Sequence, residues 1–456
     1  MSKYPLSRRQ FIHLGTGALA ATTVAKTILQ PHLLSAAARP VAPSDTIRFA
    51  SIGTGIRGCE HLEASLSVPG VKCVAVCDLY DSRHIAAQEA VKDPSVPATR
   101  DYRTILDRKD VDSVLIATMD HNHRRIFEDA CAAGKDVYCE KPMSHSVADG
   151  QAMVEAVQRG NRIFQAGSQR VSSILYAKAR EIYASGRLGE VHSIDAQWNR
   201  NSPGGAWVYP VPGDASPQTV DWDRFIQDAP QRPFDPVRFF RWRLFADYSS
   251  GLGGDLFVHM LSGVFAVTGL NTAPIRAYSS GGLYHFKDGR EFPDFLETIY
   301  DYPGPNGNIQ VHVHCNQNNN DQDEHISFFG STGTLVLTGN SVTFTPQDVT
   351  QRFEGYGWNG MTNEQRRKGM EEFRASHPVQ PPSVIPNQVE SYTVPQGYND
   401  TADHIANFFR AVNTRQHVVE DEVFGHHAAI GCHMANYSYF HRTVAVWDEE
   451  TKTIKG

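Results

Sequence analysis

One pattern near the N-terminus constrains the fold of this chain most. The apolar run Ile47–Ile52 leads into Gly53, Gly55 and Gly58, and a helix-like stretch follows these glycines. A second apolar run then ends at Asp78, at the roughly 20-residue distance from the last glycine that is typical of dinucleotide-binding βαβ units. The glycine pattern alone is common, but the strand before it and the helix, strand and acid after it make it specific. It predicts a Rossmann-type domain built on a parallel sheet.

The acid at the end of the second run favours one dinucleotide. The glycines let a pyrophosphate approach the backbone, and the following helix offers it free amides. The carboxylate of Asp78 would accept hydrogen bonds from the hydroxyls of the adenosine ribose and would repel a 2′-phosphate. We therefore expect NAD rather than NADP, with Arg83 nearby in the sequence to offset part of the repulsion.

Three more strand-like runs follow, with helix-like segments between them, as in a parallel sheet with crossover helices. Ligands of such sheets bind at the carboxyl ends of the strands. The residues just after these strands are polar: Thr118, Asp120, His121, His123, Glu140, Lys141, Gln169 and Arg170. The sequence therefore predicts a ligand crevice lined by these side chains.

The N-terminal segment has the composition of a targeting peptide. Arg8 and Arg9 precede a mild apolar run, which Lys26 interrupts before the small residues Ala36–Ala38. The run is too short for the roughly 20 apolar residues of a membrane span. "SRRQFI" resembles the twin-arginine export signal, so we expect a signal peptide over residues 1–38, export by the twin-arginine machinery, a periplasmic location and no stable membrane anchor. The net charge of −7, without a basic tract, speaks against nucleic acid as a partner.

The segment "GGDLFVHMLSG" places an acid and an imidazole among glycine and apolar residues. In a helix, Asp255 and His259 lie about one turn apart and share one face. They would then occupy one poorly hydrated space. The alternative is that Asp255 caps the helix and His259 is a buried histidine with an ordinary structural role.

Aromatic and arginine residues precede this segment, from Phe239 to Tyr248. Aromatic faces suit the C–H faces of a sugar ring, and arginine suits its hydroxyls. For any single aromatic side chain, a place in the core is the more common outcome. We expect substrate contacts from Arg170, Trp198 and Tyr248.

His312 and His314 alternate on one face of a predicted strand. Two histidines without a third ligand at suitable spacing are more often part of a polar sheet face or a subunit contact. The sequence therefore predicts no metal site.

The segment "CEKPMS", after "GTGIRG" and "IATMDHNH", resembles the glucose-fructose oxidoreductase/inositol dehydrogenase (Gfo/Idh/MocA) family, and further matches cover almost the whole chain after the signal segment. The resemblance implies an α/β protein. An N-terminal Rossmann domain, residues 45–168, would precede an α/β domain with an open, mostly antiparallel sheet, residues 169–456. It also implies a nicotinamide cofactor in the cleft between the domains and a homo-oligomer.

The resemblance also assigns site residues. The matched cofactor positions are Gly53, Gly55, Ile56, Arg57, Gly58, Asp78, Thr118, Asp120, His123, Glu140, Lys141 and Gln169. The matched catalytic positions are Lys141, Asp255 and His259. The family often has another acid three residues after the histidine, where this chain has Ser262. We therefore expect a retained catalytic set and altered substrate recognition.

These residues together predict an exported NAD-dependent oxidoreductase that acts on a secondary hydroxyl of a sugar or glycoside. His259 would take the hydroxyl proton, Asp255 would orient or relay, and Lys141 would stabilise the oxyanion while lowering the pKa of the histidine. An alternative is an NAD-dependent glycoside hydrolase, in which transient oxidation at C3 allows elimination of the glycosidic bond and the cofactor is recycled. A tightly bound cofactor would suit either enzyme outside the cytoplasm.

Overall fold

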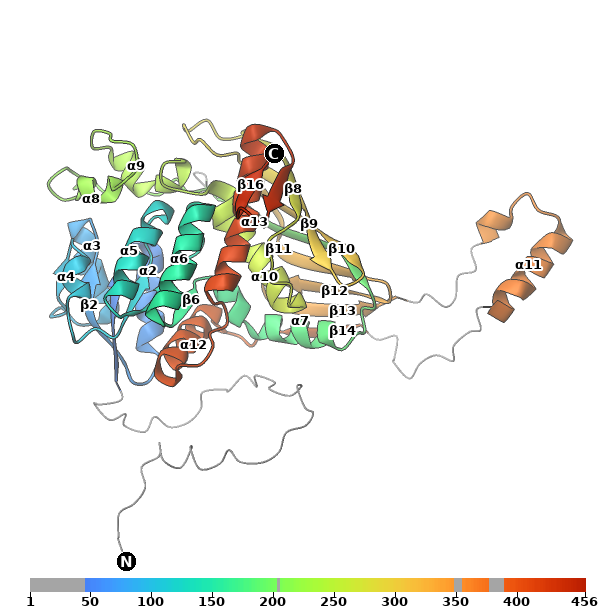
Figure 1. Ribbon diagram of the computed structural model, residues 1–456, viewed down its shortest axis with the longest axis horizontal. Coiled ribbons are helices and arrows are strands. Elements are labelled where there is room, and N and C mark those ends of the chain that lie inside the picture. The colour runs from blue at the N-terminus through green and yellow to red at the C-terminus, as the bar shows by residue number, and fades with distance from the viewer. Residues whose placement is uncertain (1–45, 203–205, 348–354, 377–388) are drawn as a thin grey trace, which may run out of the picture. The chain divides into compact units, whose positions relative to one another are not determined.

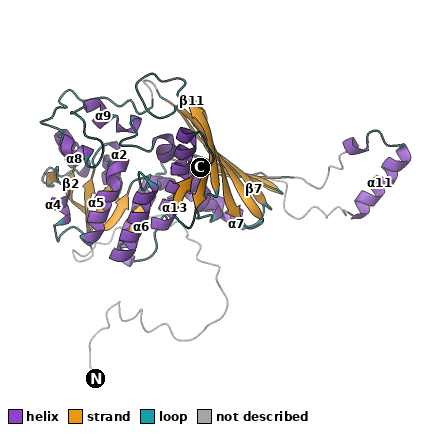
Figure 2. Cartoon of the chain, turned by 45° about the horizontal axis from the view of Figure 1, so that its top comes forward, coloured by secondary structure: helices purple, strands orange, loops and turns teal. Residues whose placement is uncertain are grey.

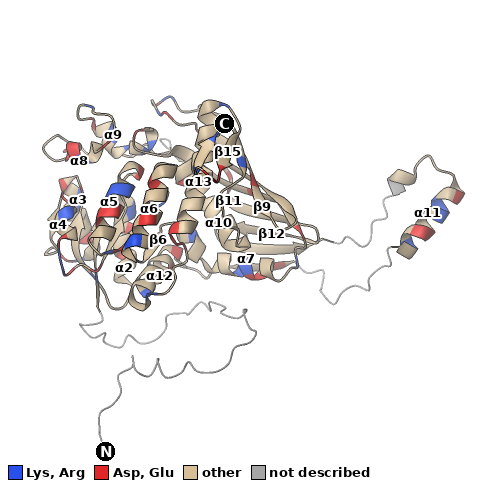
Figure 3. Ribbon diagram, viewed as in Figure 1, with Lys and Arg blue, Asp and Glu red and all other residues tan. Residues whose placement is uncertain are grey.

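The computed structural model describes residues 46–202, 206–347, 355–376 and 389–456 (Figure 1). The predicted signal peptide, residues 1–38, lies outside the described residues. Within the described ranges, no helix is long and apolar enough to cross a membrane. Acidic and basic residues alternate along the described helices that Figure 3 shows.

Residues 47–166, which we call the first half of the fold, form a six-stranded parallel sheet in the order β3-β2-β1-β4-β5-β6. Its strands are short. β4, β5 and β6 are fully buried, and β1 and β2 are buried towards their carboxyl ends, because helices cover both faces of a parallel sheet. The strands are β1 (Ile47–Ile52), β2 (Val71–Cys77), β3 (Ala98–Thr99), β4 (Ser113–Ile116), β5 (Asp136–Cys139) and β6 (Phe164–Ala166). The helices are α2 (Ile56–Leu66), α3 (Asp81–Val91), α4 (Arg103–Leu106), α5 (Asp120–Ala132) and α6 (Val147–Gly160). The predicted Rossmann architecture is confirmed.

The second half forms a ten-stranded sheet in the order β14-β13-β12-β11-β7-β10-β9-β8-β15-β16. Among the described strands of this sheet, the pair β7–β10 alone is parallel, so the predicted, mostly antiparallel sheet is also confirmed. Its strands are β7 (Val191–Asn201), β8 (Arg276–Gly282), β9 (Phe295–Gly304), β10 (Gly307–Asn316), β11 (Asn318–Gly330), β12 (Gly333–Thr338), β13 (Ser341–Pro346), β14 (Glu390–Thr393), β15 (Ala445–Asp448) and β16 (Thr453–Lys455).

Helices pack on one face of this second sheet, and Figure 2 shows the sheet beside them. Residues alternate along β10: Val311 and Val313 are fully buried beneath the helices, whereas His312 and His314 are only half-buried on the other face. The helical segments are η2 (Gln169–Ser172), α7 (Ile174–Ala184), α8 (Trp222–Ile226), α9 (Pro236–Phe240), η3 (Trp242–Leu244), η4 (Gly253–Phe257), α10 (Val258–Thr268), η5 (Gly355–Trp358), α11 (Asn363–Ser376), α12 (Asp400–Thr414) and α13 (Glu422–His441).

A helix from near the C-terminus joins the two halves. The first sheet ends at Ala166, close to the predicted domain boundary, but α12 returns to pack on α2. Its residues Phe408 and Phe409 share a buried apolar cluster with Phe49 and Tyr138 of the first sheet. The hydrophobic core of the Rossmann half is therefore completed by residues more than 200 positions later in the chain.

Candidate active site

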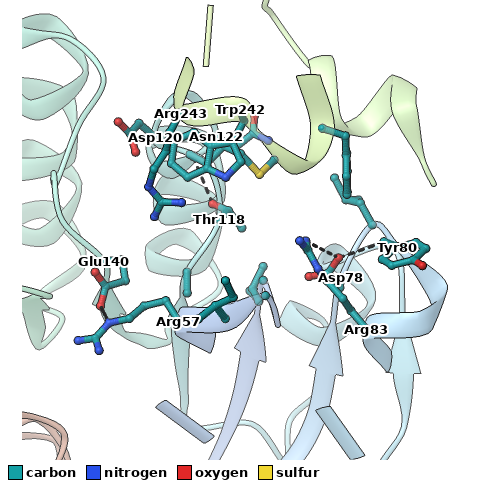
Figure 4. Close-up of a pocket in the computed structure, with 18 of the residues that line it drawn as sticks. Arg57, Asp78, Tyr80, Arg83, Thr118, Asp120, Asn122, Glu140, Trp242 and Arg243 are labelled. Atoms are coloured by element: carbon teal, nitrogen blue, oxygen red, sulfur yellow. Dashed lines mark hydrogen bonds and ion pairs between the residues drawn. The ribbon is translucent and has the colours of Figure 1, made fainter. Parts of the chain in front are cut away.

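A cavity of about 880 Å³ lies along the carboxyl ends of the first sheet and reaches the second half of the chain (Figure 4). This volume falls within the range of roughly 300–1,000 Å³ that is usual for ligand sites. Residues from both halves line it, among them Gly53, Gly55, Ile56, Arg57, Asp78, Thr118, Asp120, Glu140, Lys141, Gln169, Arg170, Trp198, Arg243, Asp255 and His259.

The glycine loop is shaped for close backbone contact. Gly53 has a φ of +87°, and a Cβ atom there would lie 2.5 Å from the carbonyl oxygen of Ala117. A Cβ on Gly58 would lie 2.0 Å from the carbonyl oxygen of Gly53, so Gly58 allows the helix to pack on the loop and does not itself line the cavity. Gly55 precedes α2, whose first turn has no side-chain cap and no acidic residue. The N-terminus of α2 therefore suits a pyrophosphate.

Asp78 lies at the end of β2 and is almost fully buried. Its two carboxylate oxygens accept hydrogen bonds from the amides of Thr54, at 2.8 Å, and Tyr80, at 3.0 Å. Arg83 Nη1 lies 3.5 Å away, and its guanidinium also lies over the ring of Phe239, 5.5 Å from the centroid. The carboxylate is thus held rigidly at the cavity wall, with lone pairs left for ribose hydroxyls.

We expect Asp78→Asn to weaken NAD binding about tenfold, because the amide loses the negative charge that strengthens its hydrogen bonds to hydroxyls. NADP affinity should rise, because the repulsion of the 2′-phosphate is removed. Fluorescence titration with NADH and NADPH measures both dissociation constants. Asp107→Asn, an exposed carboxylate in the same half of the chain, is the control. An unchanged ratio of the two constants would show that Asp78 does not select the cofactor.

Next to the glycine loop, Glu140 binds two basic side chains. Arg57 Nε donates to Glu140 Oε1 at 2.8 Å, and His61 Nε2 lies 2.8 Å from the same oxygen. Burial alone would raise the pKa of Glu140, but Arg57 and His61 overcome this effect and hold it well below its usual value. The cavity therefore carries a fixed negative charge beside Lys141.

His123 has a different place from the one predicted. It does not line the cavity: its ring lies beneath the wall, with Nδ1 3.0 Å from the carbonyl oxygen of Pro142 and Nε2 3.3 Å from that of Thr118. It supports the backbone on either side of the site, and the neighbouring Asn122 lines the cavity instead. Asp120 lines the cavity as predicted and accepts a hydrogen bond from the amide of Ser250 at 2.9 Å.

Lys141 and Asp255 meet across the two halves of the chain. Lys141 Nζ donates to Asp255 Oδ1 at 3.0 Å and to its carbonyl oxygen at 2.9 Å. Arg243 Nε donates to Oδ1 at 3.2 Å, and Trp207 Nε1 donates to Oδ2 at 2.9 Å. Burial alone would raise the pKa of Asp255, but Lys141 and Arg243 hold it far below its usual value. The carboxylate is therefore permanently ionised and bound by three donors.

The local backbone explains how Asp255 reaches this position. It lies in a π-helical turn, η4, that continues directly into α10. A Cβ on Gly254 would lie 2.4 Å from Cβ of Ser250 and 2.9 Å from Cγ of Pro142, so glycine permits η4 to pack on the residue next to Lys141. The alternative that Asp255 caps a helix is wrong, since no side-chain cap is formed there.

His259 faces the same cavity one turn later. Its side chain is only 3% exposed, and its ring centroid lies 4.9 Å from that of Trp198. Nδ1 is buried without a hydrogen-bond partner among the described residues. Burial, and then the charge of Lys141, lower the pKa of His259 well below 6.5. The imidazole is therefore neutral, and His259 lines the cavity.

Of the three predicted substrate residues, two line the cavity and one does not. Trp198 and Arg170 line the cavity, although Arg170 is also paired with Glu324, at 2.7 Å, and Asp400, at 2.8 Å. Tyr248 does not line it: the side chain is fully buried, with its ring 4.7 Å from that of Phe225. The expected substrate contact of Tyr248 is corrected to a core position, which is the usual place of a lone aromatic residue.

Ser262 is also away from the cavity. Its hydroxyl donates to Glu420 Oε1 at 3.1 Å and lies 3.3 Å from Ser168 Oγ, all in the protein interior. Its side chain serves a buried contact and does not line the cavity, and the altered substrate recognition expected from this position stays a prediction. Burial raises the pKa of Glu420 to about 8.

We expect Glu420→Gln to stabilise the protein at pH 8. A carboxyl with a pKa near 4.5 when unfolded and about 8 when folded favours the folded state at low pH, and this contribution is lost as pH rises from 4.5 to 8. The glutamine is uncharged throughout, so its melting temperature should exceed the wild type's at pH 8 by several degrees and converge with it near pH 5. Calorimetry at both values measures this, with the exposed Glu89→Gln as control. A pH-independent difference would contradict a buried titrating acid.

One segment, residues 206–250, crosses the carboxyl edge of the first sheet, and we call it the strap. The amide of Asp221 donates to the carbonyl oxygen of Leu79 at 2.8 Å, and the amide of Asp81 donates to that of Thr219 at 3.1 Å. Side chains of the strap form one wall of the cavity: Tyr209, Pro210, Pro212, Asp223, Arg224, Gln227, Phe239, Phe240, Trp242 and Arg243. A dinucleotide in this cavity would lie between the strap and the glycine loop.

Two residues that bind Asp255 were not predicted from the sequence. Trp207 had no recognisable signal, and Arg243 was visible only as one of several arginines in an aromatic segment. Both act through Asp255, from positions 48 and 12 residues away in the chain.

Residues 47–168 match the model of the Gfo/Idh/MocA proteins, an oxidoreductase family with an NAD-binding Rossmann fold. The chain is 34% identical over 149 residues to inositol 2-dehydrogenase of Salmonella typhimurium, which covers 32% of this chain and 44% of that protein. It is 29% identical over 199 residues to inositol 2-dehydrogenase of an Arthrobacter species, covering 43% and 55%. The chain thus spans about half the length of these relatives, and its residues 47–168 form an NAD-binding Rossmann domain.

Solved structures match over a longer range. A levoglucosan dehydrogenase in complex with NADH and levoglucosan aligns with a TM-score of 0.63 at 16% identity, covering 88% of this chain and 98% of that one. The aldose-aldose oxidoreductase of Caulobacter crescentus aligns with a TM-score of 0.62 at 15% identity, covering 88% and 99%. These likenesses show a shared two-part fold.

Proposed function

We propose that this protein is, over its whole length, a Gfo/Idh/MocA-type oxidoreductase that uses NAD to oxidise a secondary hydroxyl of a sugar or glycoside. One observation carries the proposal: Lys141, Asp255 and His259 come together in the same cavity as the glycine loop and Asp78. The relatives named as inositol and levoglucosan dehydrogenases are compatible with a polyhydroxylated substrate.

The residues divide the work of the reaction. NAD, when bound, supplies the hydride acceptor. His259, which is neutral and lines the cavity, takes the proton of the substrate hydroxyl, and the ammonium of Lys141 stabilises negative charge on the substrate oxygen. Asp255 orients Lys141 and cannot serve as a relay, because a carboxylate with such a low pKa and three donors does not accept a proton. The neutral state of His259 fits its role as a base.

The walls of the cavity suit a sugar. Trp198 lies against His259 and offers an aromatic face for the C–H face of a ring, and Arg200 and Trp242 also line the cavity. Arg170 has fewer N–H groups left for a substrate, because two carboxylates already bind its guanidinium. We therefore place the substrate ring against Trp198.

We further propose that NAD is tightly held and that the protein is exported by the twin-arginine route to the periplasm as a homo-oligomer. The strap supports retention of the cofactor, since its backbone hydrogen bonds hold it over the carboxyl edge of the first sheet, beside the cavity. Retention also suits the alternative, an NAD-dependent glycoside hydrolase in which each cycle returns the hydride.

The experiment is to purify the protein without added cofactor, record the ultraviolet absorption for bound NAD or NADH, and incubate it with free sugars and aryl glycosides. Oxidised sugar with reduction of NAD or of an added electron acceptor supports the oxidoreductase. Release of the aglycone without net redox change supports the hydrolase. Failure to bind NAD(H) at all, or to act on any polyhydroxylated compound, would overturn the proposal.

A further inference from the structure

The face of the large sheet that the helices leave uncovered carries a cluster of side chains of the types that bind metal ions. None of them lines the NAD cavity. His312 and His314 lie on β10, and Asp195 lies on the neighbouring strand β7. One possible ligand atom from each of the three residues lies within 4.8 Å of the others. Among the described residues, this is the one such group of histidine, cysteine or acidic side chains.

The strand geometry explains the cluster. Two histidines separated by one residue point to the same side of a strand. The parallel pairing of β7 with β10 places Asp195 directly opposite His312. This supplies the third ligand that the sequence lacked, because residues 195 and 312 become neighbours only through the strand order.

Both ring nitrogens of His312 lie next to carboxylates, and a neutral ring cannot donate to both. Its Nδ1 lies 2.8 Å from Asp195 Oδ1, and its Nε2 lies 2.7 Å from Glu297 Oε1. A neutral imidazole has one N–H, so it can satisfy only one of these two carboxylates. The second contact needs either another proton on the ring or a metal ion between the ring nitrogen and the carboxylate.

His314 favours the metal. Its Nδ1 is buried without a hydrogen-bond partner among the described residues, and its ring centroid lies 5.4 Å from that of His312. A protonated His312 would leave this nitrogen unsatisfied, whereas a shared cation would satisfy it. Glu297 would then accept the remaining N–H of His312, as carboxylates commonly do for histidine ligands of zinc.

We propose that Asp195, His312 and His314 form a binding site for a divalent transition-metal ion of the zinc class, with Glu297 as the residue that orients His312. Imidazole nitrogens favour zinc over calcium or magnesium. In a tetrahedral site, ligand atoms lie about 3.3 Å apart, which small side-chain adjustments of this cluster can reach. The ion would fasten β7 to β10 and keep one coordination position open on the outer face.

The test uses tag-free protein, treated with a chelator and then dialysed, and zinc chloride as the probe. Isothermal titration and a competing chromogenic chelator should show saturable binding of a single zinc ion per chain and a raised melting temperature. His314→Ala and Asp195→Asn should abolish this binding, and Glu297→Gln should weaken it about 10–100-fold. His192→Ala, an exposed histidine on β7 outside the cluster, should bind as the wild type does.

Visible absorption of Co²⁺ in the same protein reports the coordination directly, and it should disappear in the His314→Ala and Asp195→Asn variants. Circular dichroism shows whether each variant is folded. If His314→Ala or Asp195→Asn does not fold, the weaker zinc binding of the conservative variant Glu297→Gln still tests the proposal. No saturable zinc binding by the wild type would overturn the proposal. Equal binding by wild type and His314→Ala would overturn it as well.

Discussion

His259→Gln should lower kcat by about 10²–10⁴-fold, the usual contribution of a positioned general base. Glutamine fills similar space beside Trp198 but does not accept the proton as imidazole does. Because His259 lines the cavity without holding any other residue at Nδ1, the cofactor site should remain intact. Initial rates with the identified substrate measure the first effect, and NADH fluorescence titration measures the second.

Lys141→Met should cause a loss of similar size, since it removes the cation beside the reacting oxygen. His441→Gln is the control, because His441 is exposed at the end of α13. Wild-type rates in either His259→Gln or Lys141→Met would remove these residues from the mechanism. Loss of NADH binding together with activity would instead assign them a role in the cofactor site.

The pH dependence offers an independent check on His259. Burial and Lys141 lower its pKa, so its neutral form persists below pH 6.5. In the wild type, the decrease in kcat/KM on acidification should therefore be centred at a pH below the ordinary pKa of histidine. A decrease centred at or above 6.5 would contradict a buried, neutral base.

Asp255→Asn should reduce both activity and stability. Its carboxylate accepts from Lys141 and Arg243 at Oδ1 and from Trp207 at Oδ2. An asparagine has only one acceptor oxygen, so its NH₂ group must face at least one of these donors. Removing one partner of a buried ion pair costs about 3–5 kcal/mol, and we expect a loss towards the lower end because the side chain keeps its shape.

The same change should lower kcat/KM by at least about 100-fold, because Lys141 loses its charged partner and is held less firmly, by the backbone carbonyl of residue 255. Calorimetry and initial rates measure the two effects. Trp207→Phe keeps the aromatic ring but removes its N–H, so it should give a smaller loss of the same kind. An Asp255→Asn protein with wild-type stability and rates would show that the buried pairing does not position Lys141.

Local sequence predicted the parts of the site that depend on local geometry. The glycine loop, the acid at the end of β2 and the spacing of Asp255 and His259 are set within one βαβ unit or one helical turn, where the repeat of the backbone fixes which side chains meet. The same reasoning could not predict that Trp198 lines the cavity whereas Tyr248 is buried in the core. Both lie in aromatic surroundings, and burial depends on what packs against them.

The sequence by itself thus determined the fold class and the residues that we propose as the catalytic set. The tertiary structure decided their partners: it brought Arg243 and Trp207 to Asp255, turned Ser262 towards Glu420 and placed Asp195 opposite His312. The physical reason is that these contacts join strands and loops whose order in space is set by the packing of the whole core. The repeat of 2 residues in a strand or 3.6 in a helix says which side chains share a face, but not which distant segment of the chain packs against that face.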